Sequence, residues 1–168
     1  MEAEVTTIAY RSGIVAADSR ETWGSEAGGT SIGTCEKLFR KKVGKREVII
    51  GTAGGSYLGM VFVDWFGDIP REPPSILRDA HLDEDFTVLV LDRGKVYTAN
   101  HLCRLVEVIE PFIAIGSGRK AAMAAMHCGR SAREAVAIAC KVDPYTAPPI
   151  KTMAMPGYQR TVEARRSK

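Results

Sequence analysis

Short β-prone runs joined by turns recur in pairs along this sequence, and they limit its fold more than any other feature. The pairs occupy residues 7–10 with 14–18, 37–40 with 48–52, and 86–91 with 95–99. Two such runs on either side of a glycine-containing turn predict a β-hairpin, whose strands are antiparallel. Repeated hairpins, grouped apart from the helices, exclude a fold of alternating parallel strands and helices.

The remaining regular elements follow from periodicity and from capping patterns. Residues 57–66 carry apolar side chains at helical spacing on one broad face, which predicts a buried helix. An alanine-rich helix is expected at residues 118–128, and a capping-box pattern opens another at residues 131–142. Further strands are predicted at residues 106–109, 112–115 and 151–155.

Two segments are predicted to lack long regular elements. Residues 24–33 are rich in glycine, serine and threonine, which is typical of a loop. Prolines in residues 67–85 argue against a long uninterrupted helix there. The order of elements indicates an α+β fold and is compatible with two antiparallel sheets covered by helices, although the pattern alone does not choose that layering.

Composition narrows the function classes without naming one. The chain has 168 residues, 45% of them hydrophobic, which suits one domain with a full core. A net charge of +3 gives no strong attraction to nucleic acid or membrane, and the basic clusters at residues 40–46 and 160–168 are expected to be solvated. The four cysteines lack metal-ligand spacing, and free, mostly buried thiols in a reducing cytoplasm are the simplest expectation.

Several short segments together resemble a known family. They are Thr6-Thr7-Ile8, Ala16-Ala17-Asp18, Gly51-Thr52-Ala53-Gly54-Gly55, Phe112 to Gly118, and Ser131 to Ala135 followed by Tyr145-Thr146. Each segment alone is weak, since a GTAGG or GSG stretch serves a tight turn in many folds. In this order they resemble the β-type subunits of proteasomes, and especially the HslV-type peptidases.

The resemblance implies an N-terminal nucleophile hydrolase with a four-layer αββα sandwich of two antiparallel sheets. It also implies a cytoplasmic threonine-type peptidase that assembles into stacked homo-oligomeric rings around a proteolytic chamber, fed by an AAA+ ATPase unfoldase. Protein or peptide substrates are expected, with no cofactor, metal, nucleic acid or membrane partner. The expected organisation is residues 1–5 as a leader or misassigned start, residues 6–155 as the peptidase domain, and residues 156–168 as a basic tail.

Thr6 is the expected nucleophile, and its chemistry demands that it be the first residue. A threonine hydroxyl needs a base, and an N-terminal threonine can use its own α-amine, directly or through one water. The pKa of an ordinary α-amine is about 7.7–8.0, close to operating pH. An internal threonine has an amide nitrogen instead, which is not basic.

The resemblance assigns further roles to residues that match the family's motifs. Asp18 and Lys37 would complete the catalytic group, because a lysine ammonium near the threonine oxygen favours its ionised form and an aspartate holds that lysine in place. Gly54 and Gly55 match the oxyanion-hole segment, where the main chain can approach substrate without a Cβ in the way.

Three polar residues near the C-terminal end of the sequence complete the expected site. Ser117 matches a serine that orients the amine, and it is equally suited to cap the following helix. Asp143 and Thr146 resemble an Asp-x-x-Ser segment that supports the site, with threonine in place of serine. An aspartate and a proline at positions 143–144 also form an ordinary helix exit.

Alternatives remain open at this stage. Residues 1–5 would be removed by self-processing or by another peptidase, or the true start lies at Val5, or the chain keeps its leader and is inactive; we favour trimming or a later start. Two rival functions are a catalytically silent proteasome-like shell protein and an N-terminal nucleophile amidohydrolase acting on a small molecule. A nucleic-acid-binding module is weaker, because the basic cluster near Arg40 has no aromatic stacking partners around it.

Overall fold

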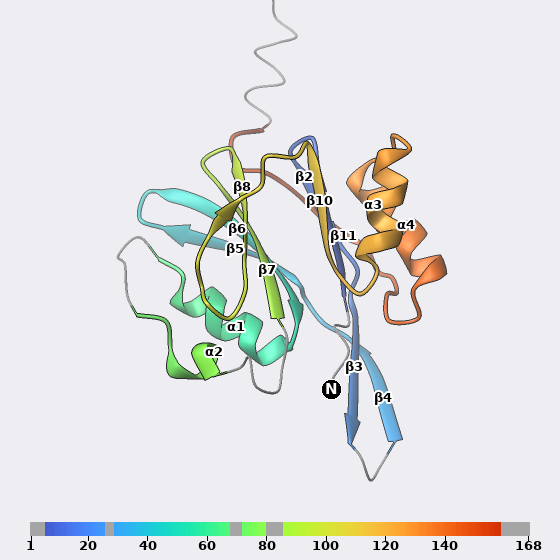
Figure 1. Cartoon of the computed structure of the whole chain (residues 1–168), viewed down its shortest axis with the longest axis horizontal. Helices are drawn as coiled ribbons and strands as arrows, with labels where there is room; N and C mark the ends of the chain where they lie inside the picture. Colours follow the sequence, from blue (N-terminus) through green and yellow to red (C-terminus); the bar gives the residue numbers. More distant parts are fainter. Residues whose placement is uncertain (1–5, 26–28, 68–71, 80–85, 159–168) are drawn as a thin grey trace, which may run out of the picture.

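The computed structural model describes residues 6–25, 29–67, 72–79 and 86–158, and of residues 23–25 and 29–31 it describes the backbone alone. Two sheets lie face to face, and a pair of helices covers the outer face of each (Figure 1). This arrangement is the predicted four-layer αββα sandwich. The predictions for residues 1–5 and 159–168 lie outside the described residues.

The first sheet has four strands in the order β10-β1-β2-β11. Its members are β1 (Thr7–Arg11), β2 (Ile14–Ala17), β10 (Phe112–Gly116) and β11 (Lys151–Ala154). Each pair is antiparallel, and the register places Thr7 opposite Gly116. The predicted hairpin of β1 and β2 is confirmed. The pairing of β1 with β10 brings the first residues of β1 beside the end of β10.

The second sheet has five strands in the order β5-β6-β7-β8-β9. Its members are β5 (Leu38–Val43), β6 (Arg46–Gly54), β7 (Phe86–Asp92), β8 (Lys95–Ala99) and β9 (Val106–Glu107). The two predicted hairpins of this region are confirmed, and β9 is shorter than the predicted strand.

Helices α3 (Arg119–His127) and α4 (Ala132–Val142) cover the first sheet, while α1 (Ser56–Trp65) and the short α2 (Ser75–Asp79) cover the second. The capping box predicted at the start of α4 is present: the Ser131 hydroxyl accepts from the Glu134 backbone N–H at 3.3 Å, and the Ser131 backbone N–H donates to the Glu134 carboxylate at 2.9 Å. Among the described residues, no helix is long and apolar enough to cross a bilayer.

The central strands are apolar on both faces because both faces are covered. Side chains of a strand alternate between faces, so Ile8 enters the core between the sheets while its neighbour Ala9 packs under α3 and α4. Leu89 and Val90 divide in the same way between the inter-sheet core and the α1 layer. This double burial explains why the strands read as continuous apolar runs rather than as alternating ones.

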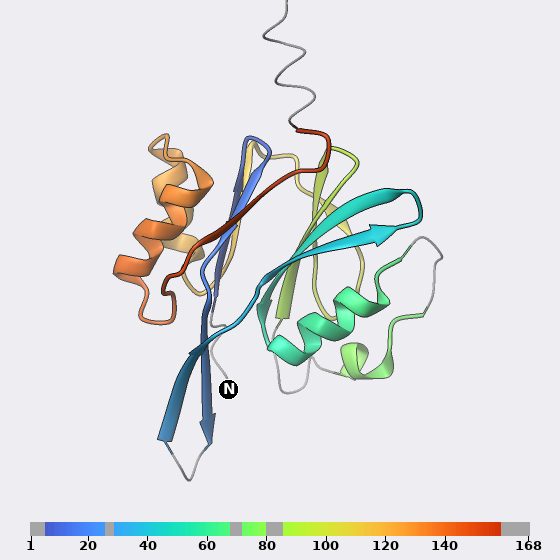
Figure 2. The same ribbon diagram turned by 180° about the vertical axis from the view of Figure 1, so that it is seen from behind.

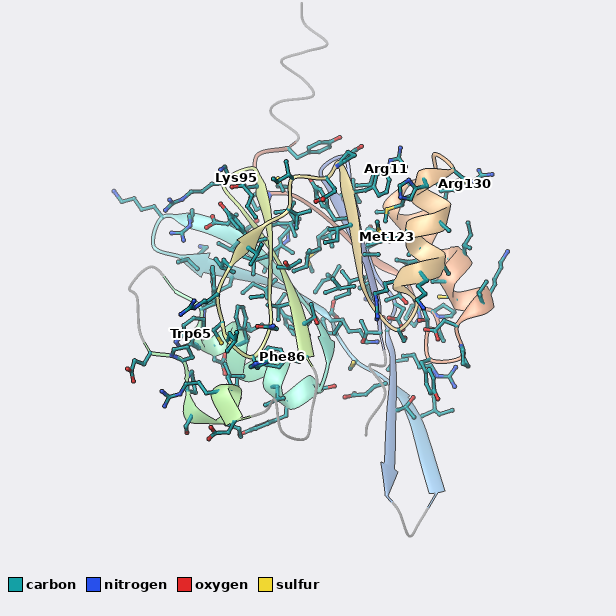
Figure 3. All side chains as sticks on the ribbon, in the orientation of Figure 1. Arg11, Trp65, Phe86, Lys95, Met123 and Arg130 are labelled. Carbon is teal, nitrogen blue, oxygen red and sulfur yellow. The ribbon has the colours of Figure 1, made fainter. Side chains whose placement is uncertain are left out.

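The helical layer on the first sheet is tied to β1 at its outer end. Arg11 and Arg130 lie at the same end of the molecule (Figure 3). The Arg11 guanidinium donates to the backbone oxygen of Arg130 at 3.0 Å and to that of Met126, and it lies 5.1 Å from the centre of the Phe112 ring. A cation at the end of a helix satisfies carbonyl groups that lack intrahelical partners. Arg11 therefore anchors the α3 layer against the sheet.

The loop predicted at residues 24–33 is wrong. Strands β3 (Arg20–Ser25) and β4 (Gly29–Thr34) pair here as an antiparallel hairpin, with Arg20 opposite Thr34. Figure 2 shows this hairpin extending beyond the two sheets. Glycine-rich composition lowers strand propensity but does not prevent pairing, because the ladder is formed by backbone groups that glycine also has.

The expectation for the cysteines is half correct. All four are free, but only Cys103 is buried, whereas Cys35 and Cys140 are half-buried and Cys128 is exposed.

Candidate active site

Thr6 lies immediately before β1, at the end of the inter-sheet core, with 1% of its surface exposed. The antiparallel pairing of β1 with β10 places the Gly116-Ser117-Gly118 turn against it. A Cβ at Gly116 would lie 2.1 Å from the Thr6 carbonyl oxygen, and Gly116 has a φ of +90°. Only glycine suits both the backbone conformation and this close approach.

The polar residues buried in the described part of the chain all gather around this point. They are Thr6, Thr7, Asp18, Ser19, Lys37, Thr52 and Thr146. Burying polar or charged groups costs free energy unless they are paired. A single cluster of such groups in an otherwise apolar interior is the pattern expected of a functional site.

Asp18 and Lys37, predicted to act together, form a buried ion pair. The Lys37 ammonium lies 3.0 Å from Asp18 Oδ1, and the two side chains are 4% and 0% exposed. Asp18 comes directly after β2, and Lys37 directly precedes β5 in the other sheet. The pair therefore joins the two sheets below Thr6.

The Asp18 carboxylate is also held by backbone groups from three segments. Its Oδ1 accepts from the Thr7 N–H at 2.8 Å, and its Oδ2 accepts from the N–H groups of Arg20 at 3.0 Å and Ala147 at 3.2 Å. Hydrogen bonds to the ionised form stabilise a buried carboxylate. Asp18 is thus the point at which β1, the base of the β3–β4 hairpin and the exit of α4 meet.

Ser117, Asp143 and Thr146 form a second polar group beside Thr6. The Ser117 hydroxyl lies 2.6 Å from Asp143 Oδ2, and the Thr146 hydroxyl donates to the same oxygen. Ser117 Oγ is also 3.4 Å from the Thr6 nitrogen and 3.2 Å from its carbonyl oxygen. An ionised carboxylate is the stronger acceptor, so the Ser117 proton points to Asp143 and its oxygen is left to accept from Thr6.

A pocket of about 260 Å³ opens next to Thr6. Its walls are formed by Thr6, Cys35, Glu36, Lys37, Phe39, Thr52, Gly54, Ser56 and Met60. From this wall the Ser56 hydroxyl donates to the Glu21 carboxylate at 2.5 Å, which ties the start of α1 to β3. The pocket is therefore shaped by the second sheet, by α1 and by the base of the hairpin.

The structure separates the two predicted oxyanion-hole glycines. Gly54 ends β6 with a φ of +94° and lines the pocket with Thr6. Gly55 is the N-cap residue of α1 and does not belong to the pocket wall. Of the two, Gly54 is the residue whose backbone lies at the pocket.

The sequence analysis missed Thr7 and most of the pocket wall. Ser56 and Met60 are one helical turn apart on α1, so their side chains share one face of the helix. Cys35, Glu36 and Lys37 are consecutive residues between β4 and β5, where no periodicity marks them. Only the fold shows that this connection and the face of α1 meet at Thr6.

Cys35 is the one thiol in the pocket wall, beside the hydroxyl groups of Thr6, Thr52 and Ser56, and its chemistry is unfavourable for a nucleophile. Burial raises the pKa of its thiol to about 11; the Glu21 carboxylate adds to the rise, while the Lys37 ammonium opposes it. The thiolate is the reactive form of cysteine. A thiol that stays protonated at neutral pH is a wall residue rather than a nucleophile.

The described residues contain no group of three or more His, Cys, Asp or Glu side chains arranged to hold a metal ion.

No protein-family model matches the sequence, and no curated protein matches it. Solved structures do match over most of the chain. BPH from Thiobacillus denitrificans, solved in complex with epoxomicin, is 20% identical, with a TM-score of 0.60 over 89% of this chain and 98% of that one. Eukaryotic HslV from Trypanosoma brucei is 15% identical, with a TM-score of 0.59 over 88% and 97%.

Anbu from Yersinia bercovieri, described as an ancestral β-subunit, is 15% identical, with a TM-score of 0.64 over 90% of this chain and 81% of that one. Likeness at these identities concerns the fold. The chain has a proteasome-like fold. Within it, Thr6 immediately precedes the first strand of the sandwich, and the buried polar cluster lies at the end of the two sheets where that strand starts.

Proposed function

We propose that this chain is a threonine-type endopeptidase subunit in which Thr6, as the first residue of the mature protein, attacks peptide carbonyl groups. The observation that carries the proposal is the gathering of the buried polar residues around Thr6. A fold stabilised by an apolar interior has no structural need for a lysine, an aspartate and several hydroxyl groups at one end of its core.

The proposed reaction uses the Thr6 α-amine as base and its hydroxyl as nucleophile. The amine takes the proton of Oγ, directly or through one water, as the oxygen attacks the carbonyl carbon. The amine then gives this proton to the departing peptide nitrogen, which leaves an ester on Thr6. A water molecule, deprotonated by the same amine, attacks the ester and restores the free hydroxyl.

Lys37 and Asp18 would supply electrostatic support. Lys37 and Thr6 line the same pocket, and the Asp18 carboxylate holds the Lys37 ammonium in place at 3.0 Å. A fixed ammonium beside the attacking oxygen favours its developing negative charge. The backbone N–H at Gly54 would face the oxyanion of the tetrahedral intermediate, and a positive φ at Gly54 is compatible with an unusual direction of its peptide group.

Ser117, Asp143 and Thr146 would orient the amine. The Ser117 oxygen is 3.4 Å from the Thr6 nitrogen, and Asp143 fixes the Ser117 proton. An amine that is already held in position loses less conformational entropy when it reaches the geometry needed for proton transfer.

The pocket beside Thr6 would receive one side chain of the substrate. The Phe39 ring and the Met60 thioether offer apolar contact to that side chain, and the exposed Glu36 lies in the same wall. We further propose assembly into homo-oligomeric rings and delivery of substrates by an AAA+ ATPase. The HslV likeness and the description of Anbu as a β-subunit support an assembled state.

The first test is the N-terminal sequence and intact mass of the protein purified from cells that express the full chain. A chain that begins at Thr6 and cleaves fluorogenic peptides supports the proposal. Thr6→Ala should then lose hydrolysis, while Thr152→Ala, at an exposed position on β11, should keep it.

Epoxomicin is a suitable probe, because the Thiobacillus structure was solved in complex with it. We expect a mass increase on incubation with epoxomicin only in the form that begins at Thr6. A protein that begins at Thr6 and neither cleaves peptides nor binds epoxomicin would refute the proposal. A protein that retains residues 1–5 would favour the silent shell.

A further inference from the structure

We propose that Thr7 is a positioning residue of this site, which locks the Thr6 segment to both of its carboxylates. The inference rests on the proposed function of Thr6. Thr7 is completely buried, and it contacts the Asp18 group through its backbone and the Asp143 group through its side chain. Thr7 follows the proposed nucleophile directly in the chain and joins the two groups, the Asp143 group through Thr146.

The backbone of Thr7 is held on both sides by Asp18. The Thr7 N–H donates to Asp18 Oδ1 at 2.8 Å, and the Asp18 N–H donates to the Thr7 carbonyl oxygen at 3.1 Å. Lys37 donates to the same Oδ1 at 3.0 Å. The Thr7 N–H and the Lys37 ammonium therefore share one acceptor, Asp18 Oδ1. This shared acceptor fixes the position of the Thr6 main chain relative to Lys37.

The side chain of Thr7 makes the other connection. Its hydroxyl oxygen lies 2.6 Å from the Thr146 hydroxyl oxygen, and Thr146 also contacts Asp143 Oδ2. An ionised carboxylate only accepts hydrogen bonds, and a hydroxyl has one proton to donate. Thr146 therefore donates its hydroxyl proton to Asp143, and Thr7 must donate to the Thr146 oxygen.

This direction of donation makes one ordered chain of hydroxyl groups. It runs from Thr7 through Thr146 to Asp143, and Ser117 donates to the same carboxylate oxygen from the other side. The Ser117 oxygen is left to accept from the Thr6 nitrogen. Asp143 thus holds Thr6 through Ser117 and Thr7 through Thr146.

The Gly-Ser-Gly turn leaves the space that the Thr7 hydroxyl occupies. A Cβ at Gly118 would lie 2.1 Å from Thr7 Oγ1 and 3.1 Å from Thr146 Oγ1. The second glycine of the Gly-Ser-Gly turn is needed because the Thr7 hydroxyl occupies that space. The turn therefore accommodates Thr6 at its first glycine and Thr7 at its second.

The test removes the hydroxyl and keeps the shape. In the form that begins at Thr6, we expect Thr7→Val to lower kcat by on the order of ten- to a hundredfold with KM within about twofold, because a misplaced reacting group loses rate while the pocket that binds substrate is untouched. Thr7→Ser, which restores the hydroxyl, should recover most of the rate. Thr98→Val makes the same change at a half-buried position on β8, in the other sheet, and should leave kcat unchanged.

A double-substitution cycle separates a shared link from two independent losses. If Thr7 acts through Thr146, Thr7→Val combined with Thr146→Val should lower kcat no further than the more severe single variant. Losses that multiply would overturn the inference, as would a Thr7→Val enzyme with unchanged kcat, or a Thr7→Ser enzyme no better than Thr7→Val.

A readout that does not need turnover distinguishes this inference from the proposed function. Nitrogen NMR titration of the Thr6 α-amine should give a lower pKa in Thr7→Val than in the wild type, because the ammonium loses a well-placed acceptor. Thr7→Ser should restore the wild-type value. If the wild type hydrolyses nothing but the amine pKa shifts as expected, the peptidase proposal fails and the positioning role stands. If the pKa is the same in all three proteins, Thr7 does not position the amine.

Discussion

The Lys37 ammonium lies 3.0 Å from Asp18 Oδ1 in a pair whose side chains are almost closed to solvent. A buried ion pair is stabilising only where its remaining hydrogen-bonding capacity is filled. Asp18 meets this condition, since backbone N–H groups occupy both of its oxygens. The pair is therefore a fixed part of the interior and connects the two sheets where Thr6 lies.

Breaking this pair should cost both stability and activity. Lys37→Met keeps most of the side-chain length but leaves the Asp18 carboxylate buried without a cation, and we expect the free energy of unfolding to fall by about 3 kcal/mol. Urea unfolding measures the change, and a peptide assay should show no hydrolysis. Lys95→Met is the matched control, because Lys95 pairs with Glu107 at 2.8 Å at the solvent-exposed surface. Loss of this exposed pair should leave the free energy of unfolding and the peptide hydrolysis unchanged. Equal effects of the two substitutions would contradict the role given to the buried pair.

Gly116→Ala should disable the site through contact with Thr6. The new Cβ would fall 2.1 Å from the Thr6 carbonyl oxygen, so the start of β1 must shift. Gly129→Ala is the control, because Gly129 has a similar φ of +85° but open space around it. Backbone strain alone costs about 1–2 kcal/mol, and we expect Gly129→Ala to show this loss with normal peptide hydrolysis. Gly116→Ala should lose more stability and all hydrolysis; if thermal unfolding and activity matched those of Gly129→Ala, the close approach would have no consequence.

Cys35 should react slowly with alkylating reagents. With a pKa of about 11, about one thiol in a thousand is ionised at pH 8, and only the thiolate is nucleophilic. Peptide mass spectrometry after brief iodoacetamide treatment should find Cys128, which is exposed, modified well before Cys35. Cys35→Ala should also retain peptide hydrolysis, because the thiol belongs to the pocket wall and is not the nucleophile. Loss of hydrolysis with normal folding would point to a cysteine mechanism instead.

The capping box of α4 should contribute stability that depends on pH. Ser131→Ala removes the cap, which typically costs about 1 kcal/mol. The pKa of Glu134 is lowered from its ordinary value of 4.5 by hydrogen bonds from the Ser131 backbone and side chain. A lowered folded-state pKa means that this contribution is complete above pH 4.5 and disappears as the pH falls through the folded value. The difference in unfolding free energy between the wild type and Ser131→Ala should therefore be larger at pH 7 than at pH 3, and a difference that grew on acidification would contradict the assignment.

Local features of the sequence determined most of the regular elements. The hairpins at residues 7–17, 38–54 and 86–99 follow from β-prone runs and their turns, and α4 begins where Ser131 and Glu134 predict. These signals act between residues close in the chain, so the sequence displays them directly. The hairpin of β3 and β4 was not predicted, because its glycine-rich composition is typical of a loop. The two strands nevertheless pair through their backbone groups, which every residue type provides.

The site was predicted only as far as a family resemblance could carry it. Thr6, Asp18, Lys37, Ser117, Asp143 and Thr146 were named from motifs, and the structure brings them together at one end of the core, where Ser117 and Asp143 are half-buried and the other four are buried. Gly54 lines the pocket with Thr6 and Lys37, whereas Gly55 is the N-cap residue of α1.

Thr7 had no signal in the sequence, because its partner Thr146 is 139 positions away. A strand residue and a helix-exit residue share no local pattern. The order of the first sheet and the docking of α4 on it decide that the Thr7 and Thr146 hydroxyls meet. The sequence by itself specified the elements and the reactive residue types, while the packing of two sheets and their helices decided which of those residues touch, since contacts between distant segments exist only once the core has formed.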